Sequence, residues 1–333
     1  MARGPFSDGL LAPLDAARSA ALRRAGPWLG PFFADRDRRV LWLGLSSVAV
    51  AFVATGAAPL WLLLLGPLLL GVPHLLSDVR YLVVRPGLHR DGWLMVGLGA
   101  PLLAVTLGAN PAVGVLAAVP AVLSAPRSRR RAPALAVAGA LAVAAWANAD
   151  GFQLIFVHAH NLVALALWFF LRSRPASHAW VPLAALAGSG LALAGALDPL
   201  VTRFGGWSAP ATGLDFGELV VSHADGLEPT LAARAVLSFC FLQSVHYAVW
   251  LRLIPEDARP RRAPRPFAAS WRALVHDFGA PALAAVAALA VGLAAWGLLA
   301  PGPARDGYLR LATFHGYLEL AVAARWLSQG RLA

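Results

Sequence analysis

The chain alternates between long apolar runs and short polar markers that are rich in arginine. A helix that crosses a membrane needs about 20 mostly apolar residues. Reading from one polar marker to the next predicts ten such spans: 40–56, 58–80, 92–109, 110–126, 132–149, 152–172, 179–198, 229–252, 278–300 and 307–326. We therefore expect an all-α, polytopic membrane bundle of about ten transmembrane helices, with residues 40–333 forming a single domain.

Residues 1–39 and the loop at 199–228 lie outside these spans and are expected to carry structure of their own. Residues 1–39 lack the early apolar run of a signal peptide. Their mix of apolar and basic positions, with Trp28, Phe32 and Phe33, predicts a short helix and a loop on the cytoplasmic surface, with aromatic rings at headgroup level. The long loop at 199–228 predicts either a lid with a short helix or an ordered polar cap.

Charge supports a membrane location and sets an orientation. The chain is 59% hydrophobic and 14% charged, against about 25% charged in a soluble domain. All 28 basic residues are arginine; with the N-terminus inside, 24 lie on the inner side of the ten spans and four on the outer side. Such a bias predicts that both termini are cytoplasmic, in an integral protein of a bacterial inner membrane.

The net charge of +11 does not indicate nucleic-acid binding. Nucleic-acid binding needs basic residues gathered in one patch, whereas these arginines are spread over many short loops. The expected partners are therefore the lipid bilayer and an apolar small molecule, and nothing in the pattern indicates an oligomeric state. The single cysteine, Cys240, lies in an apolar run and is expected to be a small core residue.

The candidate chemistry comes from ionisable residues inside the apolar spans. Five histidines lie there, with two acids one helical turn after two of them: His74, His158, His160, His246 and His315, then Asp78 and Glu319. Such residues are costly in a bilayer and usually line an interior site. His74, His246 and Glu319 each precede an inner arginine by six residues, so they share one depth, roughly 9 Å above the inner boundary.

This residue set matches known metal-ligand chemistry. His160 and His315 are expected somewhat further out, and the four histidines His74, His160, His246 and His315 form the metal-ligand set that we favour. Asp78 and Glu319 would then orient the imidazoles or complete the ligand shell; two histidines with one carboxylate, the ligand set of non-haem iron sites, is the alternative. Fe(II) is the expected metal, with zinc or haem b as alternatives.

The remaining histidines are assigned to other environments. His158 is two residues from His160, so the two side chains point about 200° apart on a helix and are not expected to bind one ion together; His160 is preferred as the ligand. His89, His178 and His276 lie in or beside inner loops and are expected at the surface. His223, in the outer loop, is left open between a site and a surface role.

One short stretch resembles a known family. Gly71-Val72-Pro73-His74, with Asp78 four residues on, is similar to a motif of the bacteriorhodopsin-related-protein (Brp/Blh) family of membrane β-carotene dioxygenases, although Leu75 stands where that family has glycine. Phe314-His315-Gly316 is similar to a further histidine of that family. The resemblance implies a polytopic enzyme with histidine-bound iron that cleaves a carotene with O₂.

Three functions remain open from the sequence. The leading hypothesis is a metal-dependent membrane oxygenase for a carotenoid, isoprenoid or lipid, with Trp168, Phe241, Tyr247, Trp250 and Phe314 lining an apolar tunnel. The second is a haem b electron-transfer protein with two axial histidines. The third is a proton-coupled transporter that uses the histidines and acids as a relay.

Overall fold

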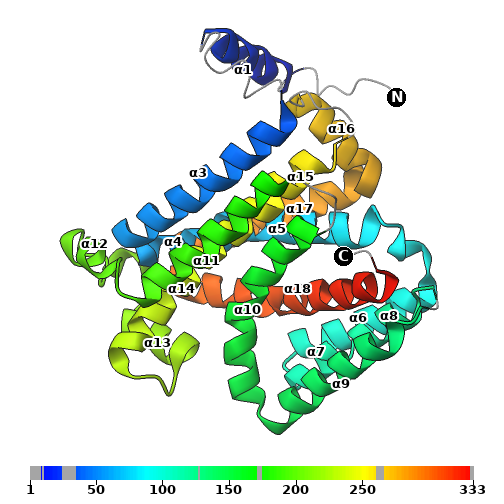
Figure 1. Cartoon of the computed structure of the whole chain (residues 1–333). Coiled ribbons are helices and arrows are strands. Elements are labelled where there is room, and N and C mark those ends of the chain that lie inside the picture. The colour runs from blue at the N-terminus through cyan, green and yellow to red at the C-terminus, as the bar shows by residue number, and fades with distance from the viewer. Residues whose placement is uncertain are drawn as a thin grey trace.

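The computed structural model describes residues 11–24, 35–126, 128–170, 175–259 and 266–330, together with Gly9. Within these ranges the chain is helical, and its one β-type contact is an isolated bridge between Ala209 and Leu214. Figure 1 shows the helices crossing one another at varied angles rather than as a parallel bundle. The predicted all-α class is confirmed for the described residues.

Six helical segments are long and apolar enough to cross a membrane. They are α3 (Arg36–Ala57), Pro59–Val84, α10 (Ala149–Phe170), Ala176–Leu193 with α11 (Trp180–Leu193), Pro229–Asp257 and α17 (Ala280–Leu299). Shorter apolar helices are α6 (Gly92–Thr106), Pro111–Leu123 with α7 (Pro111–Val115) and α8 (Ala118–Leu123), and α9 (Arg131–Ala147). The last predicted span falls in α18 (Pro301–Gln329). The six segments indicate an integral membrane protein.

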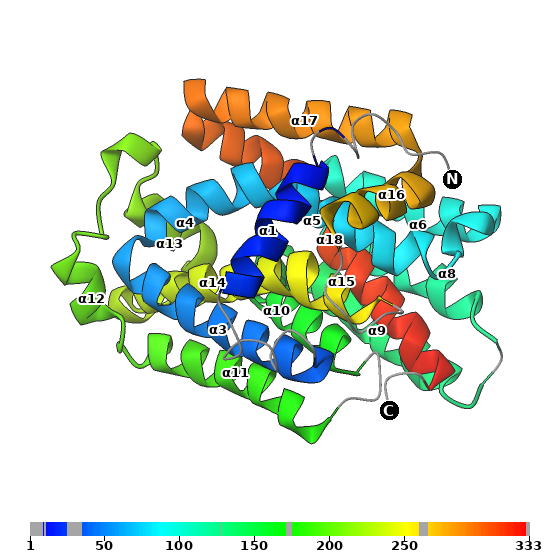
Figure 2. The same ribbon diagram turned by 90° about the horizontal axis from the view of Figure 1, so that it is seen from above.

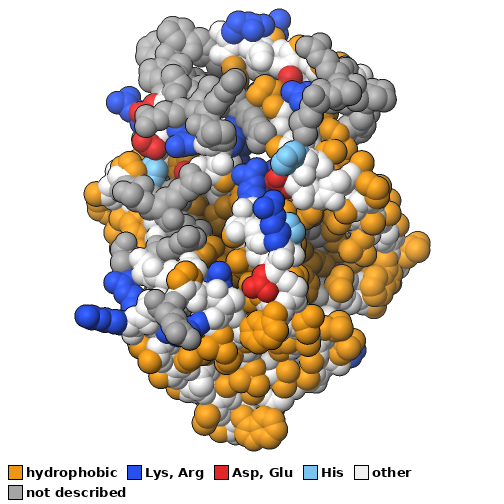
Figure 3. Space-filling model, turned by 90° about the vertical axis from the view of Figure 1, so that its right-hand side faces the viewer, with side chains coloured by type: hydrophobic (Ala, Val, Ile, Leu, Met, Phe, Trp, Pro, Cys, Tyr) orange, Lys and Arg blue, Asp and Glu red, His pale blue; other side chains and the backbone are white. Residues whose placement is uncertain are grey.

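The helices differ sharply in how much of them faces other helices. The segment that begins with α14 (Pro229–Ala248) has 78% of its most apolar stretch buried, whereas the corresponding value for α17 is 6%. Large side chains on α17 stay exposed, including Leu298 at 88% and Leu299 at 86%. Figure 2 shows α17 along one edge of the molecule, and Figure 3 shows a broad apolar surface on one face. Apolar side chains on the outside suit a lipid surrounding.

Two of these segments are interrupted at the depth where histidines lie. Between Pro59 and Val84 the chain runs through α4 (Pro59–Leu65), a π-helical stretch η2 (Gly66–Leu70), α5 (Gly71–Asp78) and a second one, η3 (Val79–Val84). The segment after α14 likewise passes through η7 (Val249–Leu253) into α15 (Ile254–Asp257). Pro67 and Pro73 each lack the backbone N–H that a regular helix needs, and π-helical turns often mark functional sites.

The segments outside the spans have structure at both ends of the molecule. The predicted N-terminal helix is present as α1 (Ala12–Arg24), whereas Trp28, Phe32 and Phe33 lie outside the described residues. Asp15 of α1 accepts hydrogen bonds from the backbone N–H groups of Phe267 and Ala268, at 2.7 and 3.1 Å. These are the first residues of α16 (Phe267–Phe278), a helix that the sequence analysis did not predict. The long loop contains α12 (Asp198–Arg203) and α13 (Phe216–Ala224), which packs on α14.

The predicted surface position of His178 is wrong. His178 was expected at the surface but is 1% exposed. Its Nε2 lies 2.9 Å from the carbonyl oxygen of Asp37, and its ring stacks on Trp168. His178 lies in a short 3-10 helix (Ala176–Ala179) between α10 and α11, and contacts with α10 and with the start of α3 bury it. A position beside a loop does not show which other segments will cover it.

Candidate metal centre

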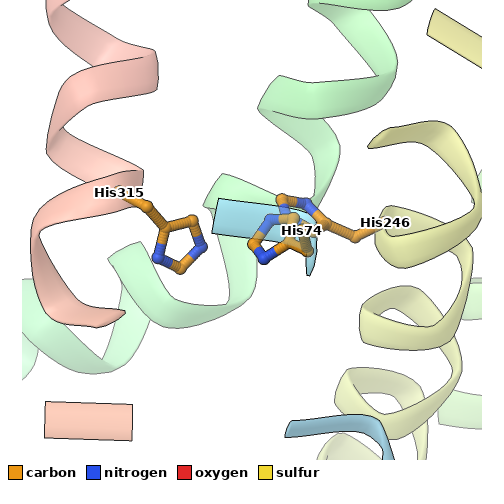
Figure 4. A group of neighbouring side chains, drawn as sticks. All are labelled: His74, His246 and His315. Carbon is orange, nitrogen blue, oxygen red and sulfur yellow. The ribbon is translucent and has the colours of Figure 1, made fainter. Parts of the chain in front are cut away.

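Four helices each place one histidine at the same point inside the protein. They are α5 with His74, α10 with His160, α14 with His246 and α18 with His315. The Nε2 atoms of His74 and His246 lie 2.8 Å apart. Nitrogen atoms of His74, His246 and His315 all lie within 4.8 Å of one another, and Figure 4 shows these three rings grouped together. The His160 ring completes the group, with its centroid 5.1 Å from that of His246 and 5.2 Å from that of His315.

Backbone contacts orient two of the four rings for ligation. His160 Nδ1 lies 2.7 Å from the carbonyl oxygen of Val157, and His315 Nδ1 contacts the carbonyl oxygen of Ala312. A carbonyl can only accept, so each Nδ1 carries the proton and each Nε2 keeps its lone pair. Fixing the tautomer in this way prepares a histidine as a metal ligand.

Two buried carboxylates lie beside the histidines. Asp78 Oδ2 is 3.2 Å from His74 Nε2, and Glu319 Oε1 is 3.7 Å from His246 Nε2. Trp250 Nε1 donates a hydrogen bond of 2.7 Å to Glu319 Oε1 and so fixes that carboxylate. Donor atoms of His74, Asp78 and Glu319 also lie within 4.8 Å of one another.

Asp78 and Glu319 lie beside the wrong ring nitrogen to act as residues that orient a metal-bound histidine. An acid that orients a metal-bound histidine accepts from the ring nitrogen facing away from the metal. Here both acids lie beside Nε2, and the Nδ1 atoms of His74 and His246 are buried without a hydrogen-bond partner. The arrangement therefore brings carboxylate oxygens toward the centre itself, as in the alternative set of histidines with a carboxylate.

A cavity of about 290 Å³ adjoins the histidines. The four histidines line it together with apolar side chains that include Phe156 and Phe239, and Arg310, which is exposed, lies at its edge. His160 and His315 are only half-buried, whereas His74 and His246 are each 1% exposed. The first pair therefore faces the open side of the cavity, and the second pair closes its inner end.

His158, which was not expected among the ligands, and His223, whose role was left open, lie together away from the centre. His158 Nε2 donates a hydrogen bond of 2.8 Å to the carbonyl oxygen of His223. His223 lies on α13, where its Nδ1 is 2.6 Å from Ser222 Oγ. Burial, with a smaller contribution from the positive charge of Arg305, lowers the pKa of the His223 imidazole to about 4. This pair joins α10 to the outer segment, and His223 also borders the cavity.

The aromatic residues expected to line a tunnel have mostly other roles. Tyr247 lines the cavity, with its ring centroid 5.2 Å from that of His74. Trp250 instead holds Glu319, and Trp168 Nε1 donates a hydrogen bond to Asp257 Oδ2. Phe241 packs edge-on against Phe52. The Trp250–Glu319 contact could not be predicted, because the spacing of residues along one helix carries no information about contacts with another helix.

Comparisons with protein-family models, with curated proteins and with solved structures give no match to this chain. The candidate metal centre is therefore interpreted from its own geometry and chemistry.

Proposed function

We propose that this protein is a membrane-embedded, metal-dependent oxygenase that acts on an apolar carotenoid, isoprenoid or other lipid. The observation that carries the proposal is the convergence of four imidazoles from four helices beside a largely apolar cavity. The proposal includes Fe(II) as the metal and the bacterial inner membrane as the location, with ten spans and both termini on the cytoplasmic side.

The residues present fit a bound metal ion. Without one, the 2.8 Å approach of His74 Nε2 to His246 Nε2 brings two lone pairs together unless one nitrogen is protonated. The two oxygens of Asp78 and Oε2 of Glu319 are buried without hydrogen-bond partners, and buried carboxylate oxygens left unsatisfied in this way are costly. A cation among these atoms would offset both penalties, and imidazole with carboxylate suits iron, as well as zinc.

Each group of residues has a separate task in this proposal. The four histidines, with Asp78 and Glu319, would hold the ion, which when bound supplies the capacity to activate O₂. Phe156, Phe239 and Tyr247 present apolar surface to the substrate and exclude water from the reacting region. Trp250 keeps Glu319 in place through its indole N–H, so the ligand geometry is set before the substrate arrives.

The close grouping of the rings favours a single ion over haem. A haem needs two axial histidines on opposite sides of a flat macrocycle, with no other side chain in its plane. Ring centroids of His74 and His315 are 4.8 Å apart, and those of His160 and His246 are 5.1 Å apart, so a macrocycle placed between any two rings would overlap the others. A proton-coupled transporter would contain no bound metal, so the experiment must distinguish it from the proposed oxygenase.

The test is metal analysis of the full-length protein purified in mild detergent without chelators. We expect about one iron per chain and O₂-dependent consumption of an added carotenoid such as β-carotene. His74→Ala and His246→Ala should each lose the metal, because each removes a donor atom from the buried inner end of the cavity.

His158→Ala is the matched control. It removes an imidazole from the same helix as His160 but touches His223 rather than the centre, so metal content should be unchanged. Wild-type protein without bound metal would overturn the oxygenase proposal and favour a transporter. Stoichiometric zinc instead of iron would point to hydrolytic chemistry.

A further inference from the structure

A second cavity, of about 320 Å³, is lined on α5 by Pro73, Leu76 and Ser77, which are neighbours of His74 and Asp78 in the sequence. Its walls come from α1, α5, η3, η7, α15 and α16, and it does not include any of the four histidines. Four arginines line it against one carboxylate: Arg18, Arg80, Arg252 and Arg259 against Glu256. The rest of the lining is mostly apolar, including Leu76, Leu251 and Leu274.

The lining carboxylate is already paired with two arginines, Arg39 outside the lining and Arg259 within it. Glu256 Oε1 accepts hydrogen bonds from Arg39 and forms an ion pair with Arg259 as well. The negative charge of Glu256 is therefore balanced by these two arginines and does not oppose the binding of an anion in the cavity. Arg18 and Arg80 pair with carboxylates outside the lining, Asp15 and Asp277, so the lining itself carries more positive than negative charge.

Two guanidinium groups retain unused donors. Arg80 is 7% exposed, and its Nε donates to Asp277 Oδ2 at 2.7 Å, yet its Nη2 is buried with no hydrogen-bond partner. Arg252 is exposed, and it forms no ion pair or side-chain hydrogen bond with any described residue. The unpaired buried donor of Arg80 costs free energy, and a phosphate offers pairs of oxygen acceptors that match the planar fork of a guanidinium group.

The surroundings of the cavity are those of a lipid headgroup site. Arg80 and Arg252 lie near the arginine-rich ends of two segments that can cross a membrane. α16 closes the cavity and is amphipathic, with apolar residues at positions 267, 271, 274, 275 and 278. Such a helix lies in the membrane interface. Basic pockets between membrane helices at this level bind the headgroups of anionic lipids.

We propose that this cavity binds the phosphate of an anionic phospholipid, with Arg80 and Arg252 as the principal contacts and the apolar wall receiving the start of its acyl chains. Arg18 lies over the ring of Phe267, 4.9 Å from its centroid, and completes the basic rim on the side of α1. The site is separate from the metal centre and does not depend on the proposed oxygenase activity.

The test is native mass spectrometry of the detergent-purified full chain. The protein is titrated with phosphatidylglycerol and, separately, with phosphatidylcholine of the same acyl chains. We expect one phosphatidylglycerol per chain to bind in preference to phosphatidylcholine. Arg252→Gln should weaken that binding about tenfold or more, since a hydrogen bond to a charged group is lost.

Matched variants separate a specific site from general attraction. Arg90→Gln makes the same charge change at an exposed position that does not line the cavity and should leave binding unchanged. Arg252→Lys keeps the charge but loses the planar fork and should give intermediate binding, so it tests the site even if Arg252→Gln folds poorly. Metal content should be unchanged in all three variants.

Three outcomes would overturn the proposal. Wild-type affinity in Arg252→Gln would show that the cavity is not the site. Equal binding of phosphatidylcholine would show that the net negative charge is not recognised. Displacement of the lipid by low concentrations of inorganic phosphate would identify a small soluble phosphate, rather than a lipid, as the ligand.

Discussion

At the scale of single residues, the two carboxylates beside the histidines give the most direct test of the centre. Asp78 and Glu319 are each 0% exposed, and Glu319 is fixed by Trp250. We expect Glu319→Gln and Asp78→Asn each to weaken metal binding about 10–100-fold, because each removes a negative charge next to Nε2 of a histidine. Competition of the purified protein with a chelator of known affinity measures this change.

The control for the carboxylate variants is Glu218→Gln. Glu218 lies in the first turn of α13, outside both groups of candidate ligands, so metal affinity should stay at its wild-type value. Unchanged affinity in both Glu319→Gln and Asp78→Asn would remove the acids from the centre and leave the histidines as its sole ligands.

A single glycine sets how closely the histidine-bearing α5 approaches α18. A Cβ added to Gly71 would overlap the ring of Tyr308, with the hydroxyl oxygen only 2.7 Å away. Small residues allow membrane helices to approach closely, and overpacking costs about 1–3 kcal/mol. Gly71→Ala should therefore lower the temperature of thermal unfolding in detergent.

Gly99→Ala serves as the matched substitution for Gly71→Ala. Gly99 is also inside a helix, α6, but a Cβ there meets nothing within 4 Å. Alanine is favoured over glycine in a helix by about 0.5–1 kcal/mol, so this variant should unfold at the same or a slightly higher temperature. If both variants behave alike, the Gly71–Tyr308 contact is not a constraint on packing.

At the scale of elements, α13 should respond to pH through His223. Its folded-state pKa of about 4 lies below the ordinary value of 6.5, so the proton binds more tightly when α13 is detached. The stability of the docked helix is constant above about pH 7, falls as the pH drops from 6.5 towards 4, and levels off below that. Hydrogen exchange of residues 216–224, corrected for the intrinsic pH dependence, measures this.

His223→Gln is the control for the pH response. The backbone carbonyl that accepts from His158 remains, while the titrating group is removed, so the corrected protection of α13 should become independent of pH in this range. An unchanged pH response in His223→Gln would assign it to another group, and the pairing of α13 with α10 would then not depend on His223 protonation.

The helices that the sequence predicted are those with a long apolar run. Every predicted span overlaps a helix, since a run of about twenty apolar residues can be recognised from the sequence alone. α16 was missed because its twelve residues are amphipathic, and its N-terminus is capped by Asp15, which lies about 250 positions earlier in the sequence. The π-helical turns around α5 were missed too, since a proline indicates a break but not its geometry.

At the scale of the whole molecule, the depth of a residue along its predicted helix indicated which residues of the candidate centre would lie together. His74, His246 and Glu319 share a distance from an inner arginine, and in the structure they lie together, with Glu319 3.7 Å from His246. Their neighbours in the plane of the membrane could not be predicted, because spacing along one helix does not show which helix stands opposite. The sequence therefore indicated which residues could meet, and packing determined the side on which the acids approach.

The orientation in the membrane is the last prediction, and it belongs to the molecule as a whole. The arginine bias places Arg90 inside and Arg203 outside; both are exposed. We expect Arg203→Cys to react with a membrane-impermeant thiol reagent in intact expressing cells, and Arg90→Cys only after the membrane is opened. Native Cys240 is 1% exposed and should not react. Labelling of both positions in intact cells would overturn the ten-span topology, because the two sites would then lie on the same side.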